Sequence, residues 1–451
     1  MTAPATDLAK AYKALKGKAA EYTLLWRYYD GDHPLVYSTA RLREVFARID
    51  ARFVENWCAV VIDATMDRIN LSGFQVADNE AATEALNQAF QATELNLDSD
   101  DAHLAALVCG ESYIIVWQDE ETGDVQAFYN DPRQCHVEYD PDNPRKKLWA
   151  AKWWIDADEK YRLTLYYPDR LEYYVSNKKA ENVSSASAFK PAETPGADNP
   201  FGVIPVFHLR RDRRKAQSEL ANAITPQDAV NKLLSDMMVA AEFGAFRQRY
   251  VISQGEPPRL KNAPNEIWTM PGSDGTGQPT RVGEFEQTDI SYYLVAIDKL
   301  ATAIAIITRT PKHYFFQQGG DPSGDALIAM EAPLNKKCGR YNERFGATWK
   351  KIGAFIALLL GLDVKETDIT PLFDRPETVQ PAAQASIRQQ SVSAGMPLVT
   401  VLRDEGKDDA YLAQMEQDAQ VARKQQQETL AAAMVSAQRQ FDQGDADEDG
   451  A

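Results

Sequence analysis

The sequence predicts an α+β protein of 451 residues, in which a β-rich segment interrupts a mainly helical chain. Three observations support this class. Apolar residues recur every three or four positions through most of the first hundred residues, which indicates amphipathic helices. After Gly110 the period changes to an alternation of apolar and polar residues, as in half-buried strands. Helical spacing returns after Thr225.

The N-terminal part is predicted to be helical. One apolar stripe runs from Leu8 to Tyr29, and Asp30-Gly31-Asp32 ends that helix. A second helical region is predicted over 39–68, followed by two shorter helices near 79–93 and 98–109.

The β-rich segment covers residues 110–176. Its runs are SYIIVWQ, VQAFYN, CHVEY, LWAAKWWI, YRLTLYY and LEYYV. We predict a mostly antiparallel sheet packed on the preceding helices. Residues 177–202, rich in Ser, Ala, Pro, Asn and Gly, are expected to form an exposed loop.

A further helix is predicted over 226–247, with Thr225 as its cap and Pro226 at its first position. Its apolar stripe is expected to pack against other helices, including copies of itself. The stripe contains Val230, Leu233, Leu234, Met237 and Met238. Short β-like pieces separated by Pro and Gly follow in 249–285, and another helix is predicted over 288–309.

Residues 311–324 form a polar segment rich in Gly and Pro between that helix and a long one predicted over 325–364. A loop presented by two helices indicates a mechanical element. Beyond Gly361 the chain becomes polar, with helices predicted near 380–394 and 409–440. The acidic tail 442–451 is expected to be disordered because it has almost no apolar content.

Composition limits the possible functions. The formal net charge of −17 argues against sequence-independent binding of nucleic acid by the whole surface. The four cysteines are widely scattered and the five histidines form no closely spaced pair, so neither a metal nor a cofactor is predicted. The apolar run 352–362 is too short to span a bilayer, and no membrane partner is expected.

No catalytic set is recognisable. Gly319 and Gly324 have the glycine spacing of a P-loop, but Asp325 stands where the phosphate-binding lysine must be. One basic run, Arg210-Arg211-Asp212-Arg213-Arg214-Lys215, is a local patch that could meet phosphate, or a solvated segment that leads into a helix.

Six segments in this order resemble the portal proteins of tailed double-stranded-DNA bacteriophages, in the group common in phages of actinobacteria. The resemblance covers nearly the whole chain. The segments are YYDGDHPL (28–35), VENWCAVVIDATMDRI (54–69), GESYIIVW (110–117), NPFGVIPVFHL (199–209), the helix region 218–251 and PSGDALIAMEAPLNKKCGRYNERFGATWK (322–350).

The resemblance implies a ring, usually of twelve subunits, at one capsid vertex. Double-stranded DNA would be packaged and ejected through its channel. The implied parts are a wing (1–220), stem helices (221–247 and 287–310), a clip (248–286), a tunnel loop (311–324), a long wing helix (325–364) and a helical crown (365–441).

It also implies partners: a terminase motor, a head–tail adaptor, the major capsid protein and a scaffolding protein. Trp268 and Phe285 are the expected docking anchors of the clip. The residues expected to line the channel are Lys312, His313, Gln317, Gln318, Gly319 and Gly320.

Two other classes stay open on the residues alone. One is a nucleic-acid-binding module for head assembly that uses the run from Arg210 to Lys215. The other is a hydrolase or nuclease whose site is assembled from residues far apart in the sequence.

Overall fold

The computed structural model divides into two compact units, Met1–Pro376 and Glu377–Ala451, each described here by itself. The residues described are 4–34, 54–119, 121–245, 249–252, 281–284, 289–315, 324–374, 381–405 and parts of 411–425. Within these residues the structure mixes helices and sheets, which confirms the α+β class.

Helix α1 (Pro4–Tyr29) has the predicted apolar stripe, and the stripe contacts two different cores. Its first half places Leu8, Tyr12 and Leu15 against the larger sheet. Its second half places Tyr22 and Tyr28 in the main core of the unit. One long helix therefore joins the two cores.

The helical region predicted over 39–68 is observed only in its second part. Helix α3 (Trp57–Met66) begins after Asn56, whose side chain accepts a hydrogen bond from the Ala59 amide. This cap starts a new helix, so the predicted region is not one continuous helix. Residues 35–53 lie outside the described part of the chain.

The two shorter helices are confirmed as α4 (Glu80–Ala92) and α5 (Leu95–Cys109). Helix α5 ends at Gly110, which has a φ of 91°. A Cβ atom at this position would lie 2.4 Å from the Gln217 amide nitrogen, so the close approach of two backbones requires glycine here.

The six predicted strands are all present, but they form two sheets rather than one. The smaller sheet has the order β3-β2-β9, with β2 (Glu111–Gln118), β3 (Val125–Asn130) and β9 (Val206–Arg210). The larger has the order β4-β5-β6-β7-β8, and every pairing in both sheets is antiparallel. Its strands are β4 (Cys135–Tyr139), β5 (Lys147–Ile155), β6 (Lys160–Tyr166), β7 (Leu171–Lys179) and β8 (Phe189–Pro191).

The expectation of an exposed loop over 177–202 is wrong in part. Strand β7 continues to Lys179, two short 3-10 helices follow (Ala180–Asn182 and Ala186–Ala188), and β8 completes the sheet edge. Phe189 and Val183 are buried beneath α1 and the larger sheet, which gives this polar-looking stretch its order.

A pair of strands was not predicted at all. Strand β1 (Leu71–Val76) pairs antiparallel with β12 (Ile369–Phe373), which follows a 3-10 turn, η5 (Glu366–Asp368). The ladder joins residues 71–76 to 369–373, so the chain returns to the first unit after its long helix. The compact unit that contains this ladder ends at Pro376, and the crown boundary predicted at 365 stays a prediction.

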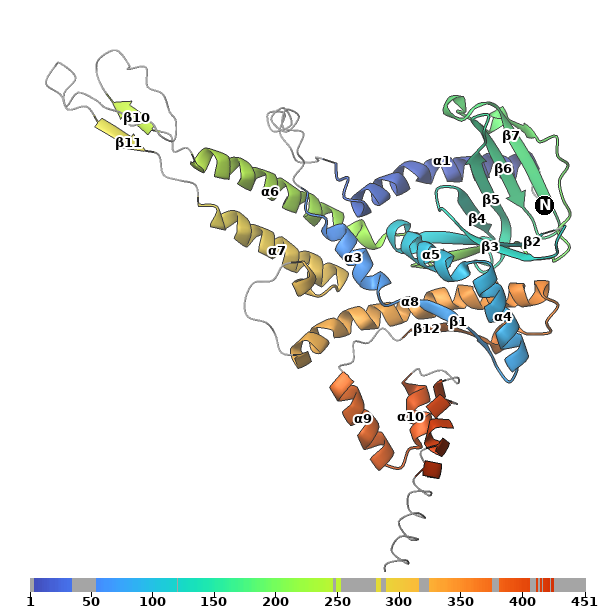
Figure 1. The fold of residues 1–451 in the computed structure, drawn as a ribbon. Helices are drawn as coiled ribbons and strands as arrows, with labels where there is room; N and C mark the ends of the chain where they lie inside the picture. Colours follow the sequence, from blue (N-terminus) through green and yellow to red (C-terminus); the bar gives the residue numbers. More distant parts are fainter. Residues whose placement is uncertain are drawn as a thin grey trace, which may run out of the picture. The chain divides into compact units, whose positions relative to one another are not determined.

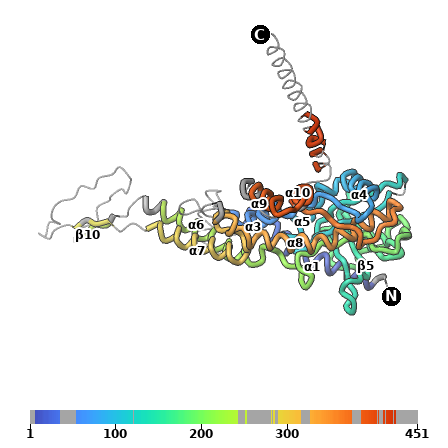
Figure 2. Tube along the Cα trace, turned by 90° about the horizontal axis from the view of Figure 1, so that it is seen from below, coloured from blue at the N-terminus to red at the C-terminus, as the bar shows by residue number. Residues whose placement is uncertain are grey.

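Two helices run side by side away from the sheets, as Figures 1 and 2 show: α6 (Ile224–Ala245) and α7 (Ser291–Thr308). Helix α6 begins at Ile224 after the 3-10 turn η3 (Glu219–Asn222), so Thr225 lies inside the helix rather than at its cap. The chain between them carries β10 (Arg249–Ile252) paired with β11 (Arg281–Glu284). The 3-10 turn η4 (Lys312–Tyr314) follows α7.

The long helix predicted over 325–364 is observed as α8 (Gly324–Leu359), which contains Pro333. It supplies Leu334, Phe345, Trp349 and Ile352 to the main core together with residues of α3, α5 and β2. The body from which α6 and α7 extend is therefore built around α8.

The second unit contains α9 (Pro381–Ser393) and α10 (Leu398–Asp404). The first confirms the helix predicted near 380–394, and the second was not predicted. Arg388 forms an ion pair with Glu405 at 2.6 Å, which ties the two helices together. Helical pieces occur within 411–425, and the tail 442–451 lies outside the described residues.

Candidate functional site: the α6–α7 helix pair and its anchor

Buried polar side chains hold the first turns of α6. Gln227 accepts a hydrogen bond from the Trp57 amide at 2.9 Å, and Asp228 accepts one from the Tyr28 hydroxyl at 2.9 Å. Asn231 donates to the ring of His33 at 2.7 Å. These partners lie on α1, on α3 and, for His33, in the segment that follows α1. The first turns of α6 are therefore fixed in the body of the unit.

The apolar stripe of α6 is buried only near that base. Val230 is fully buried, and Leu233 and Leu234 pack against the main core. Met237 is half-buried, whereas Met238 is 42% exposed. The stripe therefore leaves the core as the helix extends, and its far end lacks apolar cover from the described residues.

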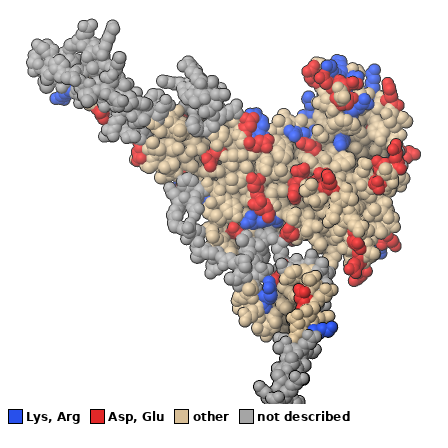
Figure 3. Space-filling model, in the orientation of Figure 1, with Lys and Arg blue, Asp and Glu red and all other residues tan. Residues whose placement is uncertain are grey.

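Helix α7 is even less covered. Only 28% of its residues are buried, although it is long and apolar enough, by length and composition alone, to cross a membrane. Tyr292 is 74% exposed and Ile306 is 73% exposed. Figure 3 shows few charged side chains over α6 and α7 on the face drawn. An uncharged surface of this kind is typical of a binding interface.

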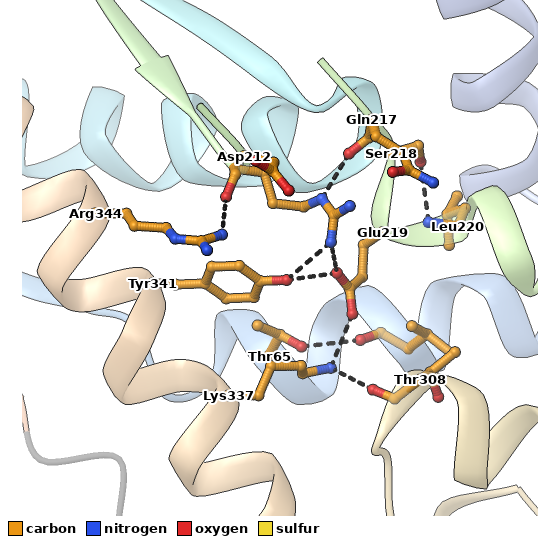
Figure 4. A network of polar contacts seen from close by, with 12 residues as sticks. Thr65, Asp212, Gln217, Ser218, Glu219, Leu220, Thr308, Lys337, Tyr341 and Arg344 are labelled. Atoms are coloured by element: carbon orange, nitrogen blue, oxygen red, sulfur yellow. Dashed lines mark hydrogen bonds and ion pairs between the residues drawn. The ribbon is translucent and has the colours of Figure 1, made fainter. Parts of the chain in front are cut away.

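The base of α7 is joined to α8 by a buried polar network, drawn in Figure 4. Glu219 of η3 is its centre. Its carboxylate lies 2.7 Å from Arg211 and 3.2 Å from Lys337, and it accepts a hydrogen bond from the Tyr341 hydroxyl at 2.6 Å. Lys337 also donates to the carbonyl of Thr308, the last residue of α7, at 2.8 Å.

Electrostatics favour this network in its charged form. Burial alone would raise the pKa of Glu219, but Lys337 and Arg211 beside it hold the pKa of this carboxyl below its ordinary value. Glu219 is therefore ionised at neutral pH. A buried carboxylate with two cationic partners and a phenol is well satisfied, so the network fixes α7 to α8.

Comparison with known proteins shows the family to which this chain belongs. Residues 11–417 match the family model described as phage portal protein, SPP1 Gp6-like. This chain belongs to that family of phage portal proteins. The resemblance seen in the sequence is thereby confirmed.

Two individual portal proteins are similar to this chain. The portal protein of Mycobacterium phage L5 is 24% identical over 343 residues, which is 70% of this chain and 66% of that protein. The portal protein of Mycobacterium phage D29 is 25% identical over 342 residues, which is 70% of this chain and 67% of that protein.

The segment that the portal resemblance assigns to the tunnel loop begins in an anchored conformation. Tyr314 donates to Glu331 and accepts from Arg68, both at 3.0 Å, and Phe315 is buried with its ring 5.8 Å from that of Trp57. Residues 311–315 are therefore fixed to α3 and α8. Residues 316–323 lie outside the described residues, and the assignment of 311–324 as a tunnel loop stays a prediction.

Lys312, the expected channel cation, is engaged within its own subunit. Its ammonium group lies 2.7 Å from the carboxylate of Asp298 on α7. The His313 ring lies against that of Tyr314, with centroids 4.7 Å apart. Gln317, Gln318, Gly319 and Gly320 lie outside the described residues.

The region assigned to the portal clip is described only in its strands. Strands β10 and β11 form an antiparallel ladder from Arg249↔Glu284 to Ile252↔Arg281. The expected anchors Trp268 and Phe285 lie outside the described residues.

The basic run is not a single patch. Arg211 is turned into the network around Glu219, and Arg214 forms an ion pair with Asp212 at 2.9 Å. Arg210 lies over the ring of Tyr139. Strand β9 ends at Arg210, so neighbouring residues of the run point in different directions.

The network formed by Glu219, Lys337 and Tyr341 could not be predicted from the sequence. Glu219 lies in a polar segment, SELANA, and Lys337 and Tyr341 lie on a helix face whose mixed charges are typical of a solvated surface. Lys337 and Tyr341 are four residues apart, which places them on one side of α8. No sequence signal identifies their partner Glu219, which lies 118 residues before Lys337.

The cysteines and the possible metal ligands of the described residues were compared with the requirements of a disulfide, a reactive thiolate and a metal site. Cys58, Cys109, Cys135 and Cys338 are all buried, and none of them forms a disulfide. Burial raises the pKa of the Cys58 thiol to about 12 and that of Cys338 to about 11, so neither is a thiolate at neutral pH. No metal-binding group of three His, Cys, Asp or Glu residues occurs in the described ranges.

Proposed function

We propose that copies of this chain form the ring-shaped channel at one vertex of a phage capsid, through which double-stranded DNA is packaged and later ejected. The family match over residues 11–417 carries this proposal. The chain acts as a structural component of the virion, assembled in the host cytoplasm, rather than as an enzyme.

The exposed apolar surface of α7 supports ring assembly. A helix of which only 28% is buried in its own subunit gains stability when neighbouring subunits cover the rest. In a closed ring each subunit presents one surface to the next. We infer that α6 and α7 are the two stem helices, and that α7 meets a neighbouring subunit rather than a lipid bilayer.

The other parts follow from this assignment. The wing comprises α1, α3–α5 and the two sheets, and α8 is the long wing helix. The clip lies between α6 and α7 and docks the terminase, and afterwards the head–tail adaptor. The crown begins after Pro376, and the ring has twelve subunits that contact the major capsid and scaffolding proteins.

A stop codon early in the gene, complemented by a tagged copy, tests the proposal in infected cells. Without complementation we expect capsids that lack DNA. With complementation, antibody against the tag should label one vertex of each particle. DNA-filled, infectious particles without the protein, or label over the whole capsid, would refute the channel function.

A further inference from the structure

A cavity of about 520 Å³ lies on the first unit, apart from the α6–α7 pair. Three stretches of chain line it. The β4–β5 hairpin contributes Arg145 and Lys147, and the end of β9 with the following turn contributes Arg210 and Arg213. The cavity is basic although the whole chain has a net charge of −17.

Helix α8 supplies the third wall and more positive charge. Arg344, Lys350 and Lys351 line the cavity from this helix. Among the described lining residues, Glu366 is the single carboxylate. Side chains that are distant in the sequence therefore converge on one volume with a large excess of cations.

Two of these cations, Lys147 and Arg210, are held in place without an acidic partner among the described residues. The Lys147 ammonium group lies 4.6 Å from the Phe207 ring centroid and donates to the carbonyl of Val206 at 2.5 Å. The Arg210 guanidinium lies 4.7 Å from the Tyr139 ring centroid. Aromatic faces and carbonyls thus position the charges and leave them uncompensated.

Four further cations of the cavity have no carboxylate partner among the described residues. Within the part of the chain that the structure describes, Arg145, Arg213, Lys350 and Lys351 form no ion pair. Burial, and to a smaller extent the nearby Lys351, lowers the pKa of Lys147 to about 7.

We propose that this cavity binds phosphate groups. A phosphate group concentrates negative charge and acceptor oxygens in a small volume, and arginine forks bind it with paired hydrogen bonds while lysines act as point charges. Bound phosphate would neutralise the repulsion among the lining cations. A carboxylate carries less charge and fewer acceptor oxygens, so it matches this cluster less well.

Two sources supply the same chemistry. The cavity is large enough to enclose a free oligophosphate, whereas a DNA duplex would place only backbone phosphates at its mouth. The cavity is separate from the proposed channel whichever source supplies the phosphate, because none of its lining residues belongs to α6, α7 or residues 311–324. The proposal therefore stands independently of the channel function.

Binding of three probes to the purified full-length protein tests it: a short fluorescent DNA duplex, inorganic tripolyphosphate and poly-glutamate. The cavity variant carries Arg213→Gln and Lys351→Gln, both at exposed positions. The matched control, Arg214→Gln with Lys215→Gln, removes the same charge from neighbouring residues that do not line the cavity.

We expect the cavity variant to weaken phosphate binding on the order of tenfold and the control to weaken it by less than about twofold. Binding of tripolyphosphate but not DNA would identify a free oligophosphate as the source, and DNA binding would identify the duplex backbone. Equal losses in both variants, binding of poly-glutamate as tight as that of tripolyphosphate, or no binding of either phosphate probe would overturn the proposal.

Discussion

Lys337 places its ammonium group 3.2 Å from the carboxylate of Glu219, and the two side chains are only 7% and 6% exposed. Because Lys337 also donates to the Thr308 carbonyl, this one pair connects the turn before α6, the end of α7 and the middle of α8. In the proposed ring, the stem is thereby coupled to the long wing helix.

Replacing Glu219 with alanine should strongly destabilise the fold. The change leaves Lys337 and Arg211 buried without their carboxylate, a loss of about 3–5 kcal/mol in the free energy of unfolding. Denaturant unfolding followed by circular dichroism measures it. Glu159→Ala, which removes an exposed partner of Lys179, should cost less than about 1 kcal/mol. Equal effects of the two variants would show that the network contributes little.

The free energy of unfolding should decrease as the pH is lowered, and His103 should account for part of this decrease. This side chain is fully buried, accepts a hydrogen bond from the Trp349 indole at 2.9 Å, and has its pKa lowered by burial to about 3. The folded state keeps His103 neutral, whereas the unfolded state takes up a proton below about pH 6.5. The favourable contribution is therefore complete above the unfolded pKa and declines as the pH falls from about 6.5 toward 3.

His103→Gln keeps an acceptor for Trp349 but does not titrate. Between about pH 7.5 and pH 5, the natural protein should lose about 2 kcal/mol more unfolding free energy than the variant. Urea unfolding at both pH values measures this difference. His208, whose pKa burial lowers to about 4, contributes equally to both proteins and cancels. Identical pH dependence would contradict a neutral buried His103.

Variants of the Lys312–Asp298 pair should change DNA handling in opposite directions. Lys312→Gln removes the cation that the sequence predicts to line the channel, whereas Asp298→Asn releases that cation from its partner at 2.7 Å. We expect weaker retention of packaged DNA in the first variant and stronger retention in the second, with rings intact in both. The length of the packaged DNA, and the fraction of particles that lose their DNA on heating, measure the change. Identical behaviour of the two variants would exclude Lys312 from the channel wall.

Replacing residues 256–280 by a short Gly/Ser linker should leave rings but prevent packaging or tail joining, because the proposed clip docks the motor and the adaptor. Electron microscopy of lysates distinguishes empty capsids from filled, tailless ones. Full, tailed particles from this variant would refute the docking assignment, including the anchor role of Trp268.

The parts of the fold with a regular apolar period could be predicted from the sequence. Helix α1 carries such a period, and strands β2–β7 could be predicted because they are short runs rich in apolar and aromatic residues. Strands β1 and β12 could not be predicted, because each is short, β12 contains Pro371, and their pairing joins segments about 300 residues apart. The break at Asn56 was missed because apolar spacing continues across it.

The site was predictable in location but not in its contacts. The sequence predicts a helix, a loop and a helix over 288–364, yet the ion pair of Lys312 and the anchoring of Tyr314 depend on partners in α7, in the turn after α3 and in α8. The run from Arg210 to Lys215 looks like one patch in the sequence, whereas in the structure Arg211 pairs with Glu219 and Arg213 lines a separate cavity. Side-chain direction at a strand end is not fixed by residue type.

We expect this chain to assemble into a ring with a channel. Negative-stain electron microscopy and light scattering of the purified protein test it most directly, with Ile306→Asp as the variant and Ile306→Val as its control, since Ile306 is 73% exposed on α7. We predict rings with a central hole for the natural protein and the valine variant, and folded monomers for the aspartate variant. A monodisperse monomer from the natural protein at high concentration would contradict the claim.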